Sequence, residues 1–234
     1  MQQGKIYLVP TFLGENNLAI ITDEVKAIVQ QLDFFVVENL RTARRYLRAI
    51  GFTKNFDTEV SMYEMAKHGS NAWSAVLAPV LAGKSCGVIS EAGCPCIADP
   101  GNSLVSYSHK KNIEIVPLVG PNSILLALIG SGFSGQQFTF HGYLPVPTPD
   151  RIKAIKKLEN EAIRTGYTQL FMETPFRNNP LFNELIRTLQ PTTLLSIGCD
   201  LTLPTQYVKT KTCKEWEAEK VDFHKRYCVF SIGK

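Results

Sequence analysis

The stretch VISEAGCPCIADPG, Val88–Gly101, combines a short apolar run with a loop rich in glycine and proline. Its apolar start, together with Gly87, is typical of a buried strand in a parallel sheet. The glycines allow unusual backbone angles or close approach, and the prolines fix φ and lack an N–H. Open α/β sheets bind ligands beyond the carboxyl ends of such strands. The stretch therefore predicts a ligand-binding loop, with an ordinary strand-to-helix turn as the alternative.

The composition is typical of a folded globular protein. Of the 234 residues, 44% are hydrophobic and 20% are charged, so we expect a packed core rather than disorder. This length allows one large domain or two small ones. The formal net charge is +4, which is compatible with an anionic partner such as RNA, although the sequence contains no basic tail or stripe.

The six cysteines and four histidines lack the spacing of a metal site. Only Cys94 and Cys96 are close together, and C-x-C is not the C-x-x-C pair of zinc or redox sites. Scattered cysteines indicate buried thiols in a reducing compartment. The sequence has no apolar run long enough to span a membrane and no signal-peptide pattern. We therefore expect a cytoplasmic protein without a metal ion.

The first half of the chain alternates short apolar runs with segments of helical periodicity. The apolar runs predict strands at 5–9, 34–37, 87–90 and 113–116. The other segments predict helices at 24–33, 44–50, 70–83 and 104–111, whereas 52–69 shows no clear pattern. Thr22 or Asp23 is expected to cap the first helix, and Ser70 the third. Such alternation predicts a parallel sheet with crossover helices.

A proline- and glycine-containing segment, 117–121, interrupts this pattern and predicts a boundary between domains 1–117 and 118–234. Asn122 or Ser123 is expected to cap a helix that continues to 129. Further helices are predicted from Pro149 to about 162 and at 179–189. Strands are predicted at 138–141, 170–172, 194–198, 206–209 and 227–232, the last two of them antiparallel. The fold class is therefore two α/β domains, with a ligand cleft expected between them.

Four loops follow predicted parallel strands, at 10–17, 38–41, 91–101 and 117–122. The carboxyl ends of parallel strands lie at one edge of a sheet, so these loops should lie together. Backbone N–H groups in glycine-rich turns, and those of the helix beginning near Asn122, bind phosphates or carboxylates. The sequence contains neither G-x-G-x-x-G nor G-x-x-x-x-G-K-[ST], which disfavours a dinucleotide-type Rossmann site and excludes a P-loop. H-E-x-x-H and G-x-S-x-G are also absent.

Seven blocks occur in a characteristic order: IYLVPTFLG (6–14), VENLR (37–41), SEAGCPCIADPG (90–101), VPLVGP (116–121), HGYLP (141–145), METPFR (172–177) and DLT (200–202). In this order they resemble the tetrapyrrole methylase superfamily, and most closely its branch that methylates a cytidine 2′-hydroxyl of small-subunit ribosomal RNA. The resemblance spans nearly the whole chain. It implies a methyltransferase with two α/β domains, S-adenosylmethionine bound in the cleft between them, and a homodimer.

The resemblance also implies which residues contact the methyl donor. Carried over by position, these are Leu13, Gly14, Ala92, Gly93, Cys94, Ile97, Asn122, Ser123, Met172, Glu173 and Leu201. The loops predicted from the residues alone agree with the resemblance, although they do not name the cofactor.

Methyl transfer to a ribose hydroxyl needs in-line positioning and benefits from a base that takes the proton. Glu38 and Glu91 stand at two loop ends and are candidate catalytic residues, while Arg41 is a candidate for holding an acceptor phosphate. Each has a structural alternative: Glu38 could cap or pair with the next helix, Glu91 could bond the N–H groups of its own turn, and Arg41 could be solvated. Asp99 is expected to fix its loop or cap the next helix, and His141 to be a core or hydrogen-bonded histidine.

Several positions depart from the pattern of the ribosomal RNA branch. Asn39 stands where that branch has an acidic residue, and Glu91–Cys94 replaces D-A-G-T. Residues 67–69 read K-H-G in place of H-N-E, and Leu203 and Gln206 replace a lysine and a glutamate. The donor-binding blocks are thus better preserved than the acceptor side.

Three functions are compatible with this pattern. The first is a methyltransferase acting on ribosomal or other RNA, which the mild basic charge favours. The second is a methyltransferase for a small, tetrapyrrole-like molecule, which would need an apolar trough rather than a basic rim. The third is a catalytically silent donor-binding module that interacts with RNA, for which Asn39, Leu203 and Gln206 are the motivating residues.

Overall fold

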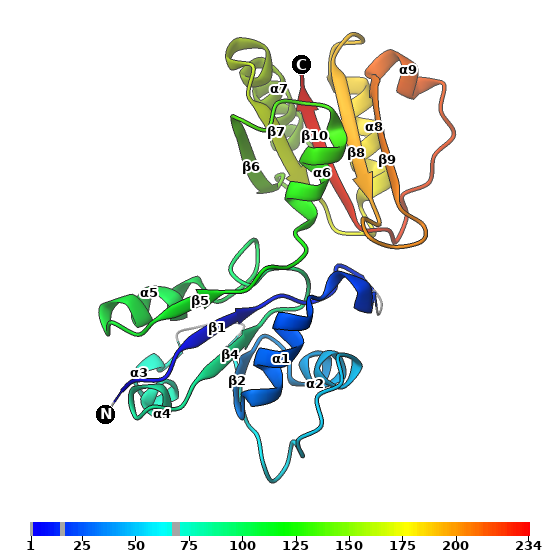
Figure 1. Cartoon of the computed structure of the whole chain (residues 1–234). Coiled ribbons are helices and arrows are strands. Elements are labelled where there is room, and N and C mark those ends of the chain that lie inside the picture. The colour runs from blue at the N-terminus through cyan, green and yellow to red at the C-terminus, as the bar shows by residue number, and fades with distance from the viewer. Residues whose placement is uncertain (1, 15–16, 67–70) are drawn as a thin grey trace. The chain divides into compact units, whose positions relative to one another are not determined.

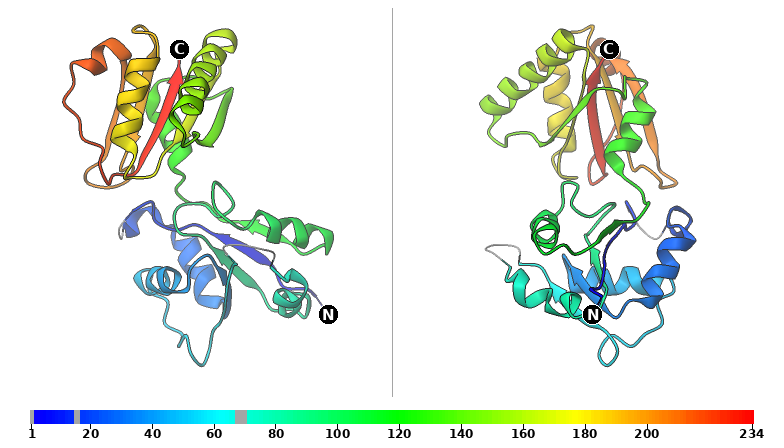
Figure 2. Two further views of the ribbon diagram at one scale, coloured as in Figure 1. Left: turned by 180° about the vertical axis from the view of Figure 1, so that it is seen from behind. Right: turned by 60° about the vertical axis from the view of Figure 1, so that its left-hand side comes forward.

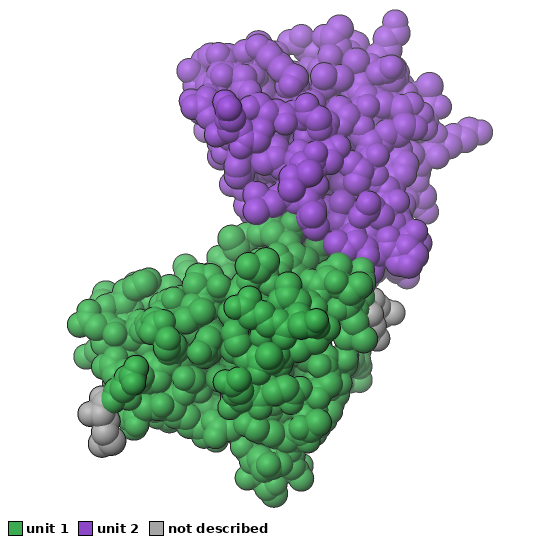
Figure 3. Space-filling view, viewed as in Figure 1, with its two compact units in different colours: residues 1–122 green, residues 123–234 purple. Residues whose placement is uncertain are grey.

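The computed structural model describes residues 2–14, 17–66 and 71–234. The chain forms two compact units, residues 1–122 and 123–234 (Figure 3). The sequence placed the boundary slightly earlier, between residues 117 and 118. The expected cap Ser70 and the departure at residues 67–69 lie outside the described residues, as does part of the loop 10–17.

Unit 1 contains a five-stranded sheet in which every strand pairs in parallel, in the order β3-β2-β4-β1-β5. Its strands are β1 (Ile6–Val9), β2 (Phe34–Val37), β3 (Ser61–Glu64), β4 (Cys86–Ile89) and β5 (Ile115–Pro117). The central strands β2 and β4 are buried along their whole length. The expected parallel sheet is confirmed, and the carboxyl ends of its strands all lie at one edge.

Helices cover both faces of this sheet (Figures 1 and 2). They are η1 (Leu18–Ile20), α1 (Asp23–Gln31), α2 (Leu40–Ala49), α3 (Trp73–Val76), α4 (Ala78–Leu81) and α5 (Asn102–Lys110). In β2, Phe35 and Val37 pack with α1 and α2, whereas Phe34 and Val36 pack with α3, α4 and α5. This alternation is why the strand reads as an uninterrupted apolar run.

The strand order creates a switch point between β1 and β4. From β1 the chain crosses to β2 over one face, and from β4 it crosses to β5 over the other. Right-handed crossovers that lead in opposite directions must use opposite faces. The chain therefore continues from these two adjacent strands toward opposite faces of the sheet, and this is the position where open α/β sheets bind ligands.

Three expectations for unit 1 need correction. Helix α2 begins at Leu40, earlier than 44, because the Asn39 side chain caps it by accepting from the N–H groups of Arg41 and Thr42. The single helix expected at 70–83 is two short helices, because Pro79 lacks an N–H and starts a new helix. The unassigned segment contains the edge strand β3, whose half-exposed residues give no apolar run.

Unit 2 contains a mixed five-stranded sheet, in the order β6-β7-β10-β8-β9. Its elements are α6 (Ser123–Ser131), β6 (Phe138–Tyr143), α7 (Thr148–Thr165), β7 (Thr168–Met172), α8 (Asn178–Thr188), β8 (Leu194–Cys199), β9 (Tyr207–Thr212), α9 (Cys213–Glu217) and β10 (Cys228–Gly233). Helix α6 contacts β8, β9 and β10, whereas α7 contacts β7 and β10. Figures 1 and 2 show α6 on one face of the sheet and α7 and α8 on the other.

The last two strands are antiparallel, as expected, but to β8 and β7 rather than to each other. Helix α9 was not predicted, although its start carries the sequence signature of a capping box, formed by Thr212 and Glu215. All six cysteines are free thiols, and four of them are buried: Cys86, Cys199, Cys213 and Cys228. The thiols of Cys199 and Cys228 lie 3.2 Å apart in opposite positions on β8 and β10.

Within the described residues no helix has the length and apolarity to cross a membrane. In the same part of the chain, no three His, Cys, Asp or Glu side chains are grouped as a metal site would need.

The cap of α1 provides a test of the local structure. The Thr22 hydroxyl accepts from the Val25 N–H at 3.2 Å, so Thr22 is the cap of the two that the sequence predicts, Thr22 and Asp23. Thr22→Ala should lower the free energy of unfolding by about 1 kcal/mol, because that N–H loses its partner. Urea denaturation measures the change. Thr22→Ser, which keeps the hydroxyl, should restore most of the loss, and equal destabilisation by both variants would contradict the capping role.

Candidate functional site

The loops after β1 and β4 are joined by backbone hydrogen bonds at the switch point. The Thr11 N–H donates to the Gly93 carbonyl oxygen at 2.8 Å, and the Gly93 N–H donates to the Phe12 carbonyl oxygen at 3.3 Å. The Tyr46 hydroxyl, from α2, donates to the Pro10 carbonyl oxygen at 2.6 Å. These bonds hold two segments that are distant in the sequence side by side.

The loop after β5 packs against the other two. A Cβ atom at Gly120 would overlap the Pro10 ring, so only glycine fits there. Gly93 has φ of +70°, and a Cβ atom there would lie 3.1 Å from Leu13 and 3.2 Å from the Pro121 carbonyl oxygen. The Cys94 thiol lies 3.4 Å from the same oxygen. The structure thus brings Leu13, Gly93 and Cys94 together next to Asn122.

The rest of the central loop is unusual in its backbone. Cys96 and Ala98 have φ of 70° and 61°, which non-glycine residues seldom adopt. Burial raises the pKa of the Asp99 carboxyl, while the neighbouring Ser90 and the Ala92 backbone act in the opposite direction. Asp99 Oδ2 is buried and has no hydrogen-bond partner among the described residues, so the loop-fixing role of Asp99 stays a prediction.

Apolar side chains of this loop are exposed to solvent. Ala92 is exposed, and Ile97 is 47% exposed. Gly14, in the loop after β1, is half-buried. The Thr11 hydroxyl is buried and has no hydrogen-bond partner among the described residues. Unsatisfied polar atoms and strained backbone are features that stability alone does not favour, and they cluster at functional sites.

The three candidate catalytic residues lie at the ends of β2 and β4. The Glu91 N–H donates to the Glu38 carboxylate at 3.0 Å, and the Thr42 hydroxyl donates to the Glu91 carboxylate at 2.9 Å. Arg41 is an exposed first-turn residue of α2. The structure therefore joins Glu38 and Glu91: Glu38 bonds the neighbouring loop, and Glu91 bonds a side chain of α2, outside its own turn.

In unit 2, the remaining candidate donor contacts lie at the edge where β7 and β8 end and β10 begins. Glu173 is 6% exposed and accepts from the Arg177 guanidinium and the Thr174 N–H, each at 2.6 Å. Met172 ends β7, and Leu201 is buried just beyond β8. Ser123 is the first residue of α6. Glu173 thus fixes the conformation of the loop after β7, including the position of the adjacent Met172.

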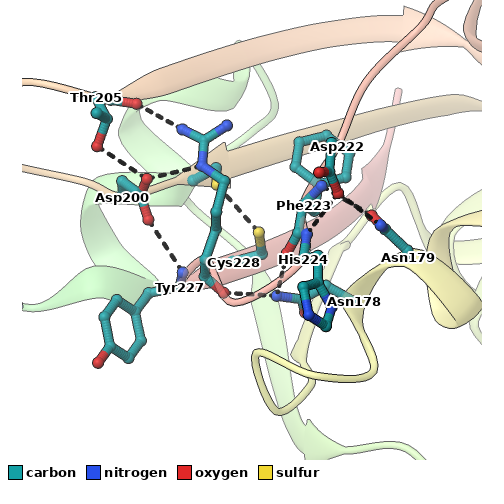
Figure 4. Close-up of polar contacts among 11 residues, drawn as sticks. Asn178, Asn179, Asp200, Thr205, Asp222, Phe223, His224, Tyr227 and Cys228 are labelled. Carbon is teal, nitrogen blue, oxygen red and sulfur yellow. Dashed lines mark hydrogen bonds and ion pairs between the residues drawn. The ribbon is translucent and has the colours of Figure 1, made fainter.

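Asp200 is the centre of a polar network at this edge (Figure 4). Its carboxylate accepts from Arg226 at 2.7 Å, from the Thr205 hydroxyl at 2.9 Å and from the Tyr227 N–H at 3.1 Å. Burial acts to raise the pKa of Asp200, but the bonds from Arg226, Tyr227 and Thr205 together hold it below its usual range. The network fixes the turn in which Asp200 has φ of 48°.

A second network joins α8 to the segment before β10 (Figure 4). The Asn178 amide donates to the carbonyl oxygens of Arg226, at 2.6 Å, and Phe223, at 3.4 Å. Asn179 donates to the Asp222 carboxylate at 2.7 Å and accepts from the Phe223 N–H at 2.8 Å. The loops at this edge are therefore rigidly connected.

Sequence reasoning did not identify Thr42, Tyr46 or Arg226. Thr42 stands three residues after the cap Asn39, and this spacing could have predicted its place beside the cap. No sequence pattern near Arg226 predicts its contact with Asp200. His141 bonds Gln169, with 2.7 Å between Nε2 and Oε1, which confirms the expected hydrogen-bonded histidine. Gln206 accepts from the Thr202 N–H at 2.8 Å, so this departure serves the turn after Asp200.

The chain is similar in sequence to several curated proteins that share the same name. It is 30% identical over 212 residues to the ribosomal RNA small subunit methyltransferase I of Mesorhizobium japonicum, covering 89% of this chain and 67% of the relative. The chain belongs to the ribosomal RNA small subunit methyltransferase I family. This confirms the resemblance to the tetrapyrrole methylase superfamily. No family model matches the chain.

Other members of the family show similar values. The Escherichia coli O157:H7 protein is 28% identical over 201 residues, covering 86% of this chain and 66% of that protein. The Vibrio cholerae protein is 31% identical over 173 residues, with coverages of 74% and 56%. The chain thus spans between 56% and 67% of the length of these relatives.

Among solved structures, the methyltransferase CobJ shares the fold. The TM-score is 0.64 at 16% sequence identity, and the match covers 99% of this chain and 94% of CobJ. Two α/β units are therefore the architecture of this chain, as the sequence predicts.

The Asp200 network predicts a pH-dependent contribution to stability. A carboxyl whose folded pKa is depressed stabilises the fold above its unfolded pKa, about 3.9, and this contribution is lost as the pH falls through the folded pKa. Asp200→Asn should lower the free energy of unfolding by about 1–3 kcal/mol at pH 7. The difference from the wild type should shrink below pH 4, as measured by urea denaturation.

The matched control is Asp222→Asn, which removes an exposed carboxylate of the neighbouring network. It should have a smaller effect at pH 7. A difference for Asp200→Asn that stays constant down to pH 2 would show that its charge does not carry the stabilisation.

Proposed function

We propose that this protein is an S-adenosylmethionine-dependent methyltransferase that modifies a ribose 2′-hydroxyl of RNA, with small-subunit ribosomal RNA as the first candidate acceptor. The observation that carries the proposal is the family relationship, which extends over 89% of this chain. The interlocked loops at the β1–β4 switch point of unit 1 support it, because ligand sites of open α/β sheets occur at such points.

The residues of these loops fit the methyl donor. Small residues such as Gly93 allow close approach of a ligand to the backbone, and the apolar side chain of Ile97 suits an adenine ring. The buried Thr11 hydroxyl has an unused hydrogen bond. The proposed contacts are Leu13, Gly14, Ala92, Gly93, Cys94, Ile97 and Asn122 of unit 1 and Ser123, Met172, Glu173 and Leu201 of unit 2. When bound, the donor supplies a methyl group already activated by its sulfonium centre.

The chain then has to position the acceptor and take its proton. We assign proton acceptance to the Glu91 carboxylate, which is exposed and held in place by the Thr42 hydroxyl. Glu38 acts as a positioning residue, because it fixes the Glu91 backbone through the N–H. Arg41, exposed at the start of α2, would bind a phosphate of the acceptor. Positioning supplies much of the acceleration, on the order of 7–11 kcal/mol in favourable systems.

Asn39 keeps the local structure that an acidic residue would provide. Asparagine and aspartate are equally good caps, and Asn39 Oδ1 accepts from two N–H groups of α2. The substitution therefore removes a charge without removing the cap, which argues against loss of function through misfolding of this loop. Homodimer formation remains a prediction of the resemblance, and cytoplasmic localisation remains a prediction of the composition.

The primary test is methyl transfer from radiolabelled S-adenosylmethionine to small ribosomal subunits that lack their own modifications. Label in the RNA would support the proposal and allow the nucleotide to be mapped. Donor binding by calorimetry without any label would exclude ribosomal RNA under these conditions and favour another acceptor or the non-catalytic function.

Gly93→Ala should weaken donor binding about tenfold or more, since φ of +70° is strained for alanine and its Cβ would lie only 3.2 Å from the Pro121 carbonyl oxygen, which then has to shift. Calorimetry measures the dissociation constant of the donor. The control is Gly135→Ala, where the nearest atom to a new Cβ would be 3.9 Å away. Equal donor affinity in Gly93→Ala and wild type would place the donor elsewhere.

Glu91→Gln should lower kcat about 10²–10⁴-fold, because the amide cannot take the proton, while donor affinity stays within a few-fold of wild type. Single-turnover methyl transfer measures the rate. Glu24→Gln, an exposed glutamate on α1, is the charge-matched control. A normal rate in Glu91→Gln would exclude this residue as the proton acceptor.

A further inference from the structure

Phe176 is a large apolar side chain that the structure leaves in solvent. It lies in the loop between β7 and α8, and it is 65% exposed. Single exposed apolar residues are common and need no explanation by themselves. Phe176 differs because the loop around it is fixed on both sides, so its exposure is a property of the folded backbone.

The backbone on each side of Phe176 is bonded to its surroundings. The Lys225 N–H donates to the Pro175 carbonyl oxygen, and the Arg177 N–H donates to the Thr174 carbonyl oxygen, both at 2.9 Å. Arg177 is also paired with the buried Glu173. The segment that carries Lys225 is itself tied to α8 through Asn178 (Figure 4). The backbone that carries the Phe176 ring is therefore held in a fixed position.

Two side chains that can carry positive charge flank the ring. The His224 ring lies 6.0 Å from the Phe176 ring, at 74° to it, and the Lys225 ammonium lies 5.9 Å from the ring centroid. Lys225 has φ of 59°, a left-handed conformation, so its backbone is held in this position against its local preference. An exposed aromatic ring with a cation beside it is the composition that binds unpaired nucleobases.

We propose that Phe176, His224 and Lys225 form a stacking platform for an unpaired base of the RNA acceptor. A base would stack on the ring of Phe176, and Lys225 would neutralise an adjacent phosphate. The platform lies at the same edge of the unit 2 sheet as Met172 and Leu201, which the proposed function assigns to the donor. This inference rests on the proposed function for the nature of the acceptor. The formal net charge of +4 agrees with an anionic rather than a basic partner.

The test uses the whole chain and a single-stranded RNA oligonucleotide of mixed sequence. In Phe176→Trp, the fluorescence of the introduced indole should be quenched when the RNA binds, because a base stacks on it, whereas Trp73 and Trp216 are buried and supply a constant background. Phe176→Ala should raise the dissociation constant of the RNA about 5- to 150-fold, which corresponds to stacking of one base. Phe176→Trp should retain wild-type affinity.

Lys225→Gln should weaken RNA binding and reduce its salt dependence by about the contribution of one phosphate. Phe138→Ala, which truncates another exposed aromatic residue of unit 2, is the control and should bind RNA normally. Donor affinity, measured by calorimetry, should be unchanged in all of these variants. Circular dichroism verifies that each is folded.

Unchanged RNA affinity in Phe176→Ala would overturn the platform, as would indole fluorescence in Phe176→Trp that does not change on RNA binding. Loss of stability with normal RNA affinity would also overturn it, since the ring would then serve a protein contact. If the wild type binds the donor but binds no RNA, the platform is overturned, whereas the proposed donor site is still supported. Failure to bind the donor would instead overturn the proposed function.

Discussion

The reciprocal backbone hydrogen bonds between the loops after β1 and β4 are the constraint on which the candidate site of unit 1 depends. Gly93 makes these bonds at φ of +70°, and a Cβ atom there would lie within 3.2 Å of both Leu13 and the Pro121 carbonyl oxygen. Once these two loops are joined, the loop after β5 has space only if residue 120 is glycine. The positions of Leu13, Cys94 and Asn122 follow from this packing.

Unit 2 positions its part of the candidate site by a different means. Side-chain hydrogen bonds that involve Asp200, Arg226, Asn178 and Glu173 hold its loops. Buried or half-buried charged groups are stabilising only when each partner is satisfied. The result is a rigid edge on which an exposed ring such as Phe176 can be held in a fixed position.

The departures from the family pattern become interpretable through local geometry. Asn39 retains the cap, and Gln206 bonds a backbone N–H, so neither position has lost its structural role. What changes is charge on the acceptor side. The Glu38 carboxylate accepts from the Glu91 N–H, so both carboxylates lie at this edge, where the proposed function needs a proton acceptor.

Local sequence patterns were sufficient to predict the order of most elements, the parallel sheet, the cap Thr22 and the loops that form the candidate site, because each depends on periodicity or on nearby residues. The resemblance of seven blocks supplied the family. The strands that pair with β9 and β10, the split at Pro79, the contact between Glu38 and Glu91 and the partners of Asp200 became evident only in the folded chain. Most of these depend on contacts between residues far apart in the sequence, such as the 53 positions that separate Glu38 from Glu91, to which local patterns are insensitive.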